Sequence, residues 1–192
     1  MKCSNYKNII CIDETYVQSN IYNKYGWSKK GTRIEKYIKS NPIKYSIIVA
    51  ISCKGIEDFL ISKNNINKNI FIKFMEKLSN KYINKSFLMD NVSFHKSKDM
   101  INMVNNKRNR VIHIPPYSPE LNPIEEVFSK FKKLVVKENG NILSKIKNVL
   151  NSLKSATLKI IINIVILRIL KDIPRYKNNL RFWVTLNIPI IR

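Results

Sequence analysis

The chain has 192 residues and a mass of 22.6 kDa, which suits one well-buried domain but is short for two independent cores. Lys and Arg total 35 against 13 Asp and Glu, a formal net charge of +22. Such a basic excess points to a polyanionic partner, nucleic acid first. Because 28 of the basic residues are lysine, an A/T-rich gene explains part of the charge equally well. Hydrophobic residues make up 44% of the chain, which excludes a wholly disordered protein.

Neither a membrane span nor a secretory signal is expected. The longest apolar stretch, residues 160–167, is less than half of what a bilayer requires, and the first residues lack the apolar core of a signal peptide. Three cysteines, Cys3, Cys11 and Cys53, form no C-x-x-C pair, which disfavours a disulfide framework and a zinc site. We therefore expect an intracellular protein that acts at DNA, without membrane contact and with reduced cysteines.

The first third of the chain reads as antiparallel strands. A continuous apolar run over residues 9–12 predicts a strand buried on both faces, which ends at Asp13. Further β-rich runs over 22–27, 44–52 and 55–62 are separated by turn signals, and they predict antiparallel neighbours.

The middle of the chain alternates helices and strands. Apolar residues recur at helical spacing over 70–82, which predicts an amphipathic helix covering the sheet. A strand over 86–90, a short helix over 98–106 and a strand over 110–114 follow. Strand, helix and strand in this order imply a parallel pair.

The last predicted helix opens at Asn122–Pro123, with Asn122 as N-cap and Pro123 at the first helical position. One or two further helices are expected over residues 141–170. The order predicts an α/β fold: a mixed sheet of three antiparallel strands plus two parallel strands, with helices packed on it. We expect the domain to span residues 1–150 and a helical or irregular tail to span 151–192.

Carboxylates end the two most apolar runs. The chain has only five aspartates, yet Asp13 and Asp90 directly follow predicted buried strands. Carboxyl ends of adjacent parallel strands lie side by side, and Glu125 stands in the first turn of the helix after the last strand. Two anions so close repel each other unless cations lie between them, and such hard oxygen ligands select Mg²⁺ or Mn²⁺. Three carboxylates suit two metal ions, whose typical chemistry is phosphodiester cleavage or transfer.

Each carboxylate also has a structural interpretation. Asp13 and Asp90 both suit the start of a turn. Glu125 stands three residues after Asn122, the spacing of a capping box. Glu126 competes for the third acidic position, but Glu125 lies nearer the apolar stripe of its helix.

Four segments carry a resemblance to a known family: Ile12-Asp13-Glu14, Gly26-Trp27-Ser28-Lys29-Lys30-Gly31, Met89-Asp90-Asn91 with His95, and the block from Pro116 to Glu125. They resemble the catalytic domain of mariner-like DDE transposases of insertion sequences, which also place 34 residues between the second and third carboxylates. The resemblance covers about residues 5–150.

The resemblance implies an RNase H-like fold and a catalytic, metal-binding triad of Asp13, Asp90 and Glu125. It also implies two Mg²⁺ or Mn²⁺ ions per site, and Mg-dependent cleavage, strand transfer and integration of double-stranded DNA at transposon ends. Asn91 and His95 fall on motif positions near the site, where a turn and a half-buried histidine are their plainer roles.

Basic residues next to these motifs are candidate DNA contacts. Lys29, Lys30 and Arg33 follow Trp27, which we expect to be core or a lid beneath them rather than a base-stacking platform. Lys132 and Lys133 lie on the helix that carries Glu125, where a solvated helix face is an equally good interpretation.

One feature departs from the family. Family members carry a helix-turn-helix region before the catalytic domain, whereas Asp13 lies twelve residues after Met1. We expect either a separately encoded helix-turn-helix subunit or a decayed element, and a homodimer or higher assembly on DNA. Two alternatives stay open: a catalytically silent, basic DNA-binding relic or domesticated fragment, and an RNase H-like nuclease acting on RNA or hybrids.

Overall fold

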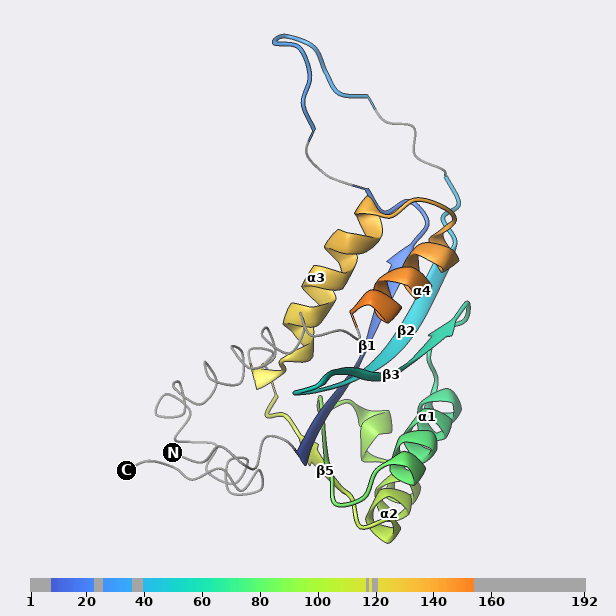
Figure 1. Cartoon of the computed structure of the whole chain (residues 1–192). Coiled ribbons are helices and arrows are strands. Elements are labelled where there is room, and N and C mark those ends of the chain that lie inside the picture. Colours follow the sequence, from blue (N-terminus) through green and yellow to red (C-terminus); the bar gives the residue numbers. More distant parts are fainter. Residues whose placement is uncertain (1–7, 23–25, 36–39, 117, 119–120, 154–192) are drawn as a thin grey trace, which may run out of the picture.

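The computed structural model describes residues 8–22, 26–35, 40–116, 118 and 121–153. A five-stranded sheet in the order β3-β2-β1-β4-β5 forms its centre (Figure 1). The strands are β1 (Ile9–Gln18), β2 (Lys44–Ser52), β3 (Gly55–Ser62), β4 (Ser86–Met89) and β5 (Arg110–His113). The helices are α1 (Lys68–Lys81), the 3₁₀ turn η2 (Ser93–Lys96), α2 (Lys98–Asn106), α3 (Ile124–Lys137) and α4 (Ile142–Ser152). The predicted α/β fold with three antiparallel and two parallel strands is confirmed.

The antiparallel half of the sheet is built from β1, β2 and β3. β1 pairs antiparallel with β2, and β2 pairs antiparallel with β3. Gly55 opens β3 with a φ of 120°, a conformation that glycine adopts without steric cost and that closes the tight β2–β3 connection. The Ile- and Val-rich β2 is buried along almost its whole length, as expected for a central strand.

The parallel half sets the position of the carboxylates. β1 and β4 run parallel, and the last registered pair is Cys11 with Leu88. Asp13 on β1 and Asp90 directly after β4 each stand two residues beyond this pair, so the shared register brings these two carboxylates to the same level. The carboxylates therefore meet where β4 ends, while β1 continues to Gln18.

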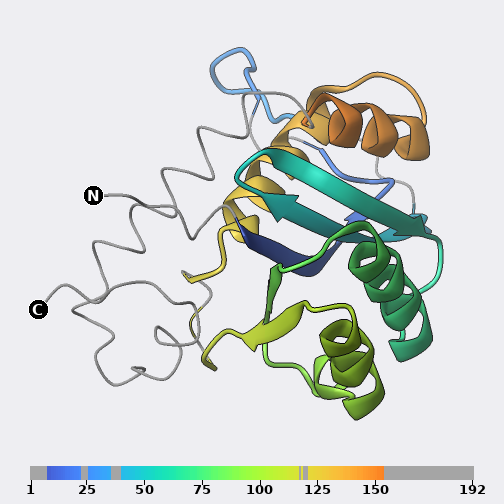
Figure 2. The same cartoon turned by 60° about the horizontal axis from the view of Figure 1, so that its bottom comes forward.

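Helices cover the two faces of the sheet, with α1 and α2 on one face and α3 and α4 on the other (Figure 2). Side chains alternate between these faces along β1. Ile10 and Ile12 pack toward α1 and α2, whereas Cys11 and Val17 belong to the cluster with α3 and α4. Asp13 therefore belongs to the α3 face, and Glu14 belongs to the α1 face.

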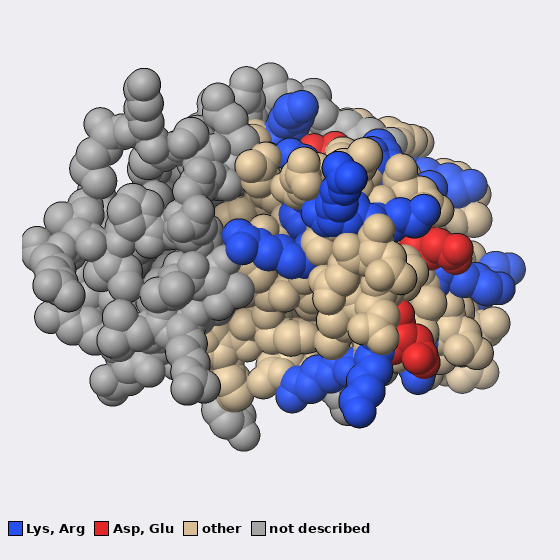
Figure 3. Space-filling view, turned by 90° about the horizontal axis from the view of Figure 1, so that it is seen from below, with Lys and Arg blue, Asp and Glu red and all other residues tan. Residues whose placement is uncertain are grey.

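The charged side chains of the helices lie outside this core. In α1, the residues Phe71, Phe74, Met75 and Leu78 are buried, and the lysines between them face solvent, as an amphipathic helix requires. On the face seen in Figure 3, Lys and Arg side chains are spread over the described surface, and acidic side chains form only a few small groups.

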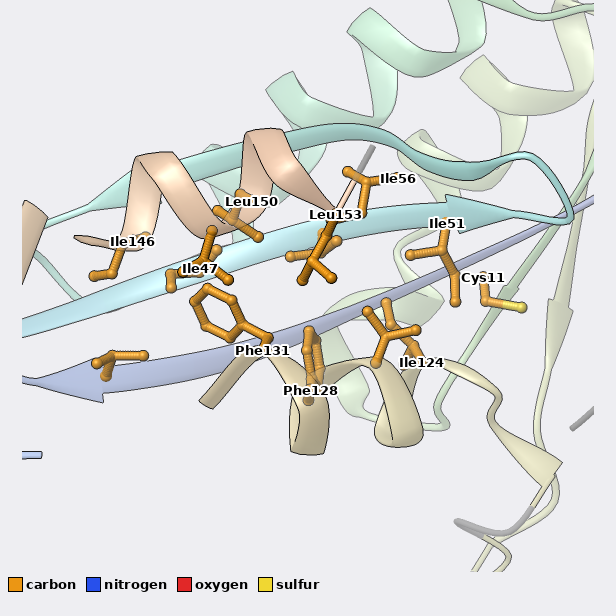
Figure 4. Close-up of a cluster of buried hydrophobic side chains, with 14 of the residues drawn as sticks. Cys11, Ile47, Ile51, Ile56, Ile124, Phe128, Phe131, Ile146, Leu150 and Leu153 are labelled. Atoms are coloured by element: carbon orange, nitrogen blue, oxygen red, sulfur yellow. The ribbon is translucent and has the colours of Figure 1, made fainter. Parts of the chain in front are cut away.

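The cluster on the α3 face fixes the helix that carries Glu125. Phe128 and Phe131 of α3 pack with Ile47 of β2 and with Leu150 of α4 (Figure 4). Ile124, the first residue of α3, is fully buried in the same cluster. The start of the helix is therefore held against the sheet, and Glu125 follows directly.

Four expectations from the sequence need correction. The first strand does not end at Asp13, because Thr15 and Val17 continue its buried pattern to Gln18. The described residues of 22–27 form no strand. Trp27 is not core, since its side chain is fully exposed.

The fourth correction concerns the start of α3. The helix begins at Ile124 with Pro123 as its N-cap, one residue later than predicted, while Oδ1 of Asn122 still accepts from the N–H of Ile124. Of the region 141–170, residues 142–152 form α4, and residues beyond 153 lie outside the described part. Among the described helices, none is long and apolar enough to cross a bilayer.

Candidate active site

The three predicted carboxylates line one cavity of about 360 Å³ beside the carboxyl end of β4. Asp13 comes from β1, Asp90 follows β4, and Glu125 stands in the first turn of α3. The remaining lining residues are Asn91, Ile114, Pro115, Pro116, Ser118 and Asn122. Three segments far apart in the chain thus present acidic side chains to the same space, which is where open α/β sheets commonly bind ligands.

Asp13 is the most enclosed of the three carboxylates. Asp13 is 9% exposed, and its Oδ1 accepts a hydrogen bond from the backbone N–H of Glu14 at 2.7 Å. Burial raises the pKa of Asp13 to about 7, against the opposing effect of the Glu14 N–H. The negative charges of Asp90, Glu14 and Glu125 add to the increase. A buried carboxylate among like charges favours either a proton or a cation.

Asn122 is a site residue that sequence reasoning treated only as a helix cap. Its Nδ2 donates to Oδ2 of Asp13 at 2.9 Å, and its Oδ1 accepts from the backbone N–H of Ile124 at 3.4 Å. The Asn122 side chain thus serves the start of α3 and Asp13 at once, and the hydrogen bond at the helix start comes from the N–H of Ile124, not from the N–H of Glu125 that a capping box uses. No local signal predicts a hydrogen bond between residues 109 positions apart.

Asp90 contacts a buried histidine, His95, that does not line the cavity. Nδ1 of His95 lies 2.6 Å from Oδ1 of Asp90, and Nε2 of His95 lies 3.2 Å from Oε1 of Glu14. Burial disfavours the charged imidazole, but the hydrogen bonds to Asp90 and Glu14 outweigh it and raise the pKa of His95 to about 9. The histidine expected to be half-buried has a side chain with no exposure.

Glu125 and Glu126 are both exposed in the first turn of α3, but only Glu125 lines the cavity. Carboxylates in this position also interact favourably with the helix dipole. Asn91 lines the cavity beside Asp90.

The donor chemistry of the cavity fits a divalent cation, because three carboxylates are hard oxygen ligands. Burial first, and then the charges of Asp90, Glu14 and Glu125, raise the pKa of Asp13, and a cation at this place would favour its charged form. As the side chains stand, no group of three or more His, Cys, Asp or Glu in the described segments is close enough to hold a metal ion. The fit is therefore one of ligand type and shared cavity.

The predicted basic contacts are not gathered at the cavity. Lys29, Lys30 and Arg33 lie in an exposed loop that projects past the Lys137 end of α3, whereas Glu125 lies at the other end (Figure 1). The neck of this loop is closed by a hydrogen bond from the N–H of Ser19 to the carbonyl of Ile43.

The tip of this loop is a tight turn. The N–H of Thr32 donates to the carbonyl of Lys29 at 2.9 Å, and Gly31 supplies the φ of 85° that the turn needs. Lys29 and Lys30 are therefore presented together at the tip.

On α3, Lys132 lies with its Nζ 5.6 Å from the centre of the Tyr16 ring, and Lys133 is exposed. Lys44 approaches the same ring to 4.8 Å. Tyr16 is itself 54% exposed. Lys44, Lys132 and Tyr16 therefore form a basic surface on the outer part of β1.

The family model of the DDE superfamily endonucleases matches residues 8–149 of this chain. The chain belongs to the DDE superfamily endonucleases. The match begins one residue before β1 and ends inside α4, so this DDE domain includes all three cavity carboxylates. No sequence among curated proteins matches the chain.

Solved structures of Mos1 transposase have a similar fold, and with it the RNase H-like architecture expected from the sequence. The catalytic domain of Mos1 mariner transposase has a TM-score of 0.61 at 16% identity, over 86% of this chain and 78% of that one. A Mos1 paired-end complex with the left transposon end gives 0.66 at 16% identity, over 81% of this chain. A pre-cleavage Mos1 transpososome gives 0.71 at 14% identity, over 99% of this chain and 59% of that one. The chain spans about half the length of the transposase in the paired-end complex, 50%.

Proposed function

We propose that this DDE domain is a transposase catalytic domain that cleaves DNA at transposon ends and transfers the strands, with divalent metal ions held by Asp13, Asp90 and Glu125. The observation that carries the proposal is the convergence of these three carboxylates on one cavity. Among the similar Mos1 structures are paired-end complexes with Mg and with Mn, which supports Mg²⁺ or Mn²⁺ as the metal. Three carboxylates suit two ions per site.

Each cavity residue has a separate part in this proposal. The oxygens of Asp13, Asp90 and Glu125 would bind the ions. Asn122 fixes one Asp13 oxygen through its 2.9 Å hydrogen bond, which limits the rotation of that carboxylate. When bound, the metal ions would activate a water or a 3′-hydroxyl and neutralise charge on the departing oxygen. No covalent protein nucleophile is needed.

DNA is the substrate that this proposal requires. The net charge of +22 favours association with phosphates, and the Mos1 paired-end complex contains a transposon end. In this proposal two basic groups contact the DNA backbone. One is the exposed loop with Lys29, Lys30 and Arg33, and the other is the pair Lys132 and Lys133 on α3. Assembly as a homodimer or higher on DNA, and a helix-turn-helix subunit for end recognition, stay predictions.

A second candidate function is DNA binding without catalysis, favoured by the same net charge, which needs no carboxylate. The two functions differ in what a carboxylate substitution does. If the chain only binds DNA, Asp90→Asn keeps the DNA affinity of the wild type and its steep salt dependence. In that case neither the wild type nor Asp90→Asn cleaves DNA.

The test is cleavage of supercoiled plasmid and of nicked duplexes by the wild type and by Asp90→Asn, in Mg²⁺ and in Mn²⁺. Glu126→Gln serves as the matched control, because Glu126 is acidic and exposed but does not line the cavity. The proposal predicts cleavage by the wild type and the control, and at least a ~100-fold loss in Asp90→Asn, since metal-mediated charge stabilisation contributes several kcal/mol. Equal rates in the wild type and Asp90→Asn, or no cleavage by any of them, would contradict it.

A further inference from the structure

His95 connects two carboxylates that belong to different strand ends. Its side chain has no solvent exposure, and its two ring nitrogens contact Asp90 at 2.6 Å and Glu14 at 3.2 Å. Nδ1 also lies 3.3 Å from the backbone oxygen of Asp90. The ring stacks on Phe71, with 4.2 Å between centroids. Contacts at both nitrogens and at one ring face leave the imidazole a single orientation.

The local structure explains how the three groups meet. Glu14 follows Asp13 on β1, so its side chain lies on the opposite face of the sheet. The η2 turn, with the N–H of His95 bonded to the carbonyl of Val92, folds the chain back beneath Asp90. Phe71 of α1 closes the far side of the ring. Glu14 does not line the cavity.

The contact with His95 engages only one of the two carboxylate oxygens of Asp90. Its Oδ1 is buried and lies 2.6 Å from Nδ1 of His95 as a close ion pair without hydrogen-bond geometry, yet the side chain as a whole is 40% exposed. The oxygen that remains open to the cavity is therefore Oδ2. A carboxylate with one oxygen already fixed loses less rotational freedom when the other binds a cation. Partners of this kind orient metal ligands and commonly change metal affinity by 10–100-fold when removed.

We propose that Glu14 and His95 are positioning residues, which hold Asp90 so that its Oδ2 points into the cavity, and that Glu14 is not itself a metal ligand. The inference rests on the proposed function, in which Asp90 binds the metal. His95 is not a catalytic residue, because its ring has no exposed surface through which to reach a substrate.

Two amide substitutions separate positioning from packing. In His95→Asn the amide nitrogen lies about where Nδ1 was, which keeps a donor for Asp90 and removes the contact with Glu14. In His95→Gln the nitrogen lies about where Nε2 was, which keeps the contact with Glu14 and leaves Asp90 unsupported. Both variants lose the ring on Phe71 and the same charge, so a merely structural histidine would make them equally defective.

The experiment is a titration of the full chain with Mn²⁺ alone, with free Mn²⁺ followed by its paramagnetic resonance signal. We expect His95→Gln to bind Mn²⁺ about 10–100-fold more weakly than the wild type, and His95→Asn to stay within about threefold of it. Equal affinities in the two variants would overturn the positioning role. Asp90→Asn is measured alongside. A wild-type affinity in Asp90→Asn overturns the proposed function as well, whereas its loss with equal His95 variants overturns only this inference.

Glu14→Ala keeps the inference testable if the His95 variants do not fold. Glu14 is reached only through His95, so we expect a loss of about tenfold in Mn²⁺ affinity, smaller than the loss in Asp90→Asn. A loss as large as that of Asp90→Asn would make Glu14 a ligand, and an unchanged affinity would remove it from the site. Either result overturns the inference.

Discussion

At the level of the cavity, the two faces of the sheet treat neighbouring carboxylates in opposite ways. On the α3 face, Asp13 points with Asp90 and Glu125 into an open cavity. On the α1 face, Glu14 reaches a histidine that is fully buried against Phe71. One face leaves negative charge uncompensated, and the other pairs it with an imidazole whose pKa is raised to about 9.

A single strand, β1, thus contributes both to the cavity and to the contacts behind it. Because side chains alternate along β1, two consecutive acidic residues are separated by the thickness of the sheet. The open face should therefore bind the metal and control cleavage directly, whereas the closed face should act on stability and, through Asp90, on metal affinity.

The largest effect is expected from Phe71→Ala on the closed face. Phe71 is fully buried and carries the ring of His95, so its truncation leaves a cavity and should lower the free energy of unfolding by about 3–5 kcal/mol. Urea unfolding followed by circular dichroism measures the change. Phe71→Leu, which keeps most of the volume, should cost less than about 1.5 kcal/mol. A loss below 1 kcal/mol in Phe71→Ala would show that the closed face is not the supporting one.

On the open face, Glu125→Gln should reduce DNA cleavage about 100-fold or more and change the free energy of unfolding by less than about 0.5 kcal/mol, since Glu125 is exposed. Its neighbour on the helix supplies the control: Glu126→Gln alters the same charge without touching the cavity. Cleavage rates and urea unfolding are measured on the same preparations. Equal cleavage in the two variants would remove Glu125 from the site.

Without metal, the open face should weaken the fold as pH rises through the weakly acidic range. Burial raises the pKa of Asp13 from 3.8 to about 7, so between these values the native state binds more protons than the unfolded state. The free energy of unfolding should then fall with rising pH, by at most about 1.4 kcal/mol per pH unit from this group. Unfolding in EDTA at pH 4 to 7 measures the slope, and Asp13→Asn should remove this contribution. An unchanged slope in that variant would contradict a raised pKa of the buried Asp13 carboxylate.

The closed face should respond in a higher pH range. The pKa of His95 is raised from 6.5 to about 9 because its contacts with Asp90 and Glu14 outweigh its burial. Its contribution to stability is complete below pH 6.5 and is lost as pH rises through 9. Between pH 6.5 and 9 the free energy of unfolding should therefore fall less steeply with pH in His95→Gln than in the wild type. If the wild type shows no decline in this range, the imidazole is not charged in the native state.

The fold followed from the sequence where the pattern was local. The runs over 44–52 and 55–62 and the helix over 98–106 have the predicted bounds, because hydrophobic period and turn residues determine them within a few positions. The end of β1 did not follow. Asp13 reads as the end of a strand, but β2 continues to pair with β1 as far as Gln18, and only the other neighbour, β4, ends early.

The convergence of the acidic residues on one cavity could be predicted from the sequence. The residues that contact these carboxylates could not. The proximity of Asp13 and Asp90 could be predicted because each follows an apolar run, and the parallel register of β1 and β4 brings the ends of these two runs to the same level. The hydrogen bond from Asn122 to Asp13 and the contact of Glu14 with His95 join residues far apart in the chain. Such pairs depend on how α3 and η2 settle on the sheet, which no local pattern encodes. The full exposure of Trp27 has the same origin, since burial is decided by the path of the whole loop.

The most direct test of the central claim is a crystal structure of the protein soaked in Mn²⁺, with anomalous scattering used to place the ions. The account predicts anomalous peaks inside the cavity at coordination distance from oxygens of Asp13, Asp90 and Glu125, with Glu14 still on His95. A cavity without a peak at saturating Mn²⁺, or an ion held by Glu14 in place of Asp90, would contradict it.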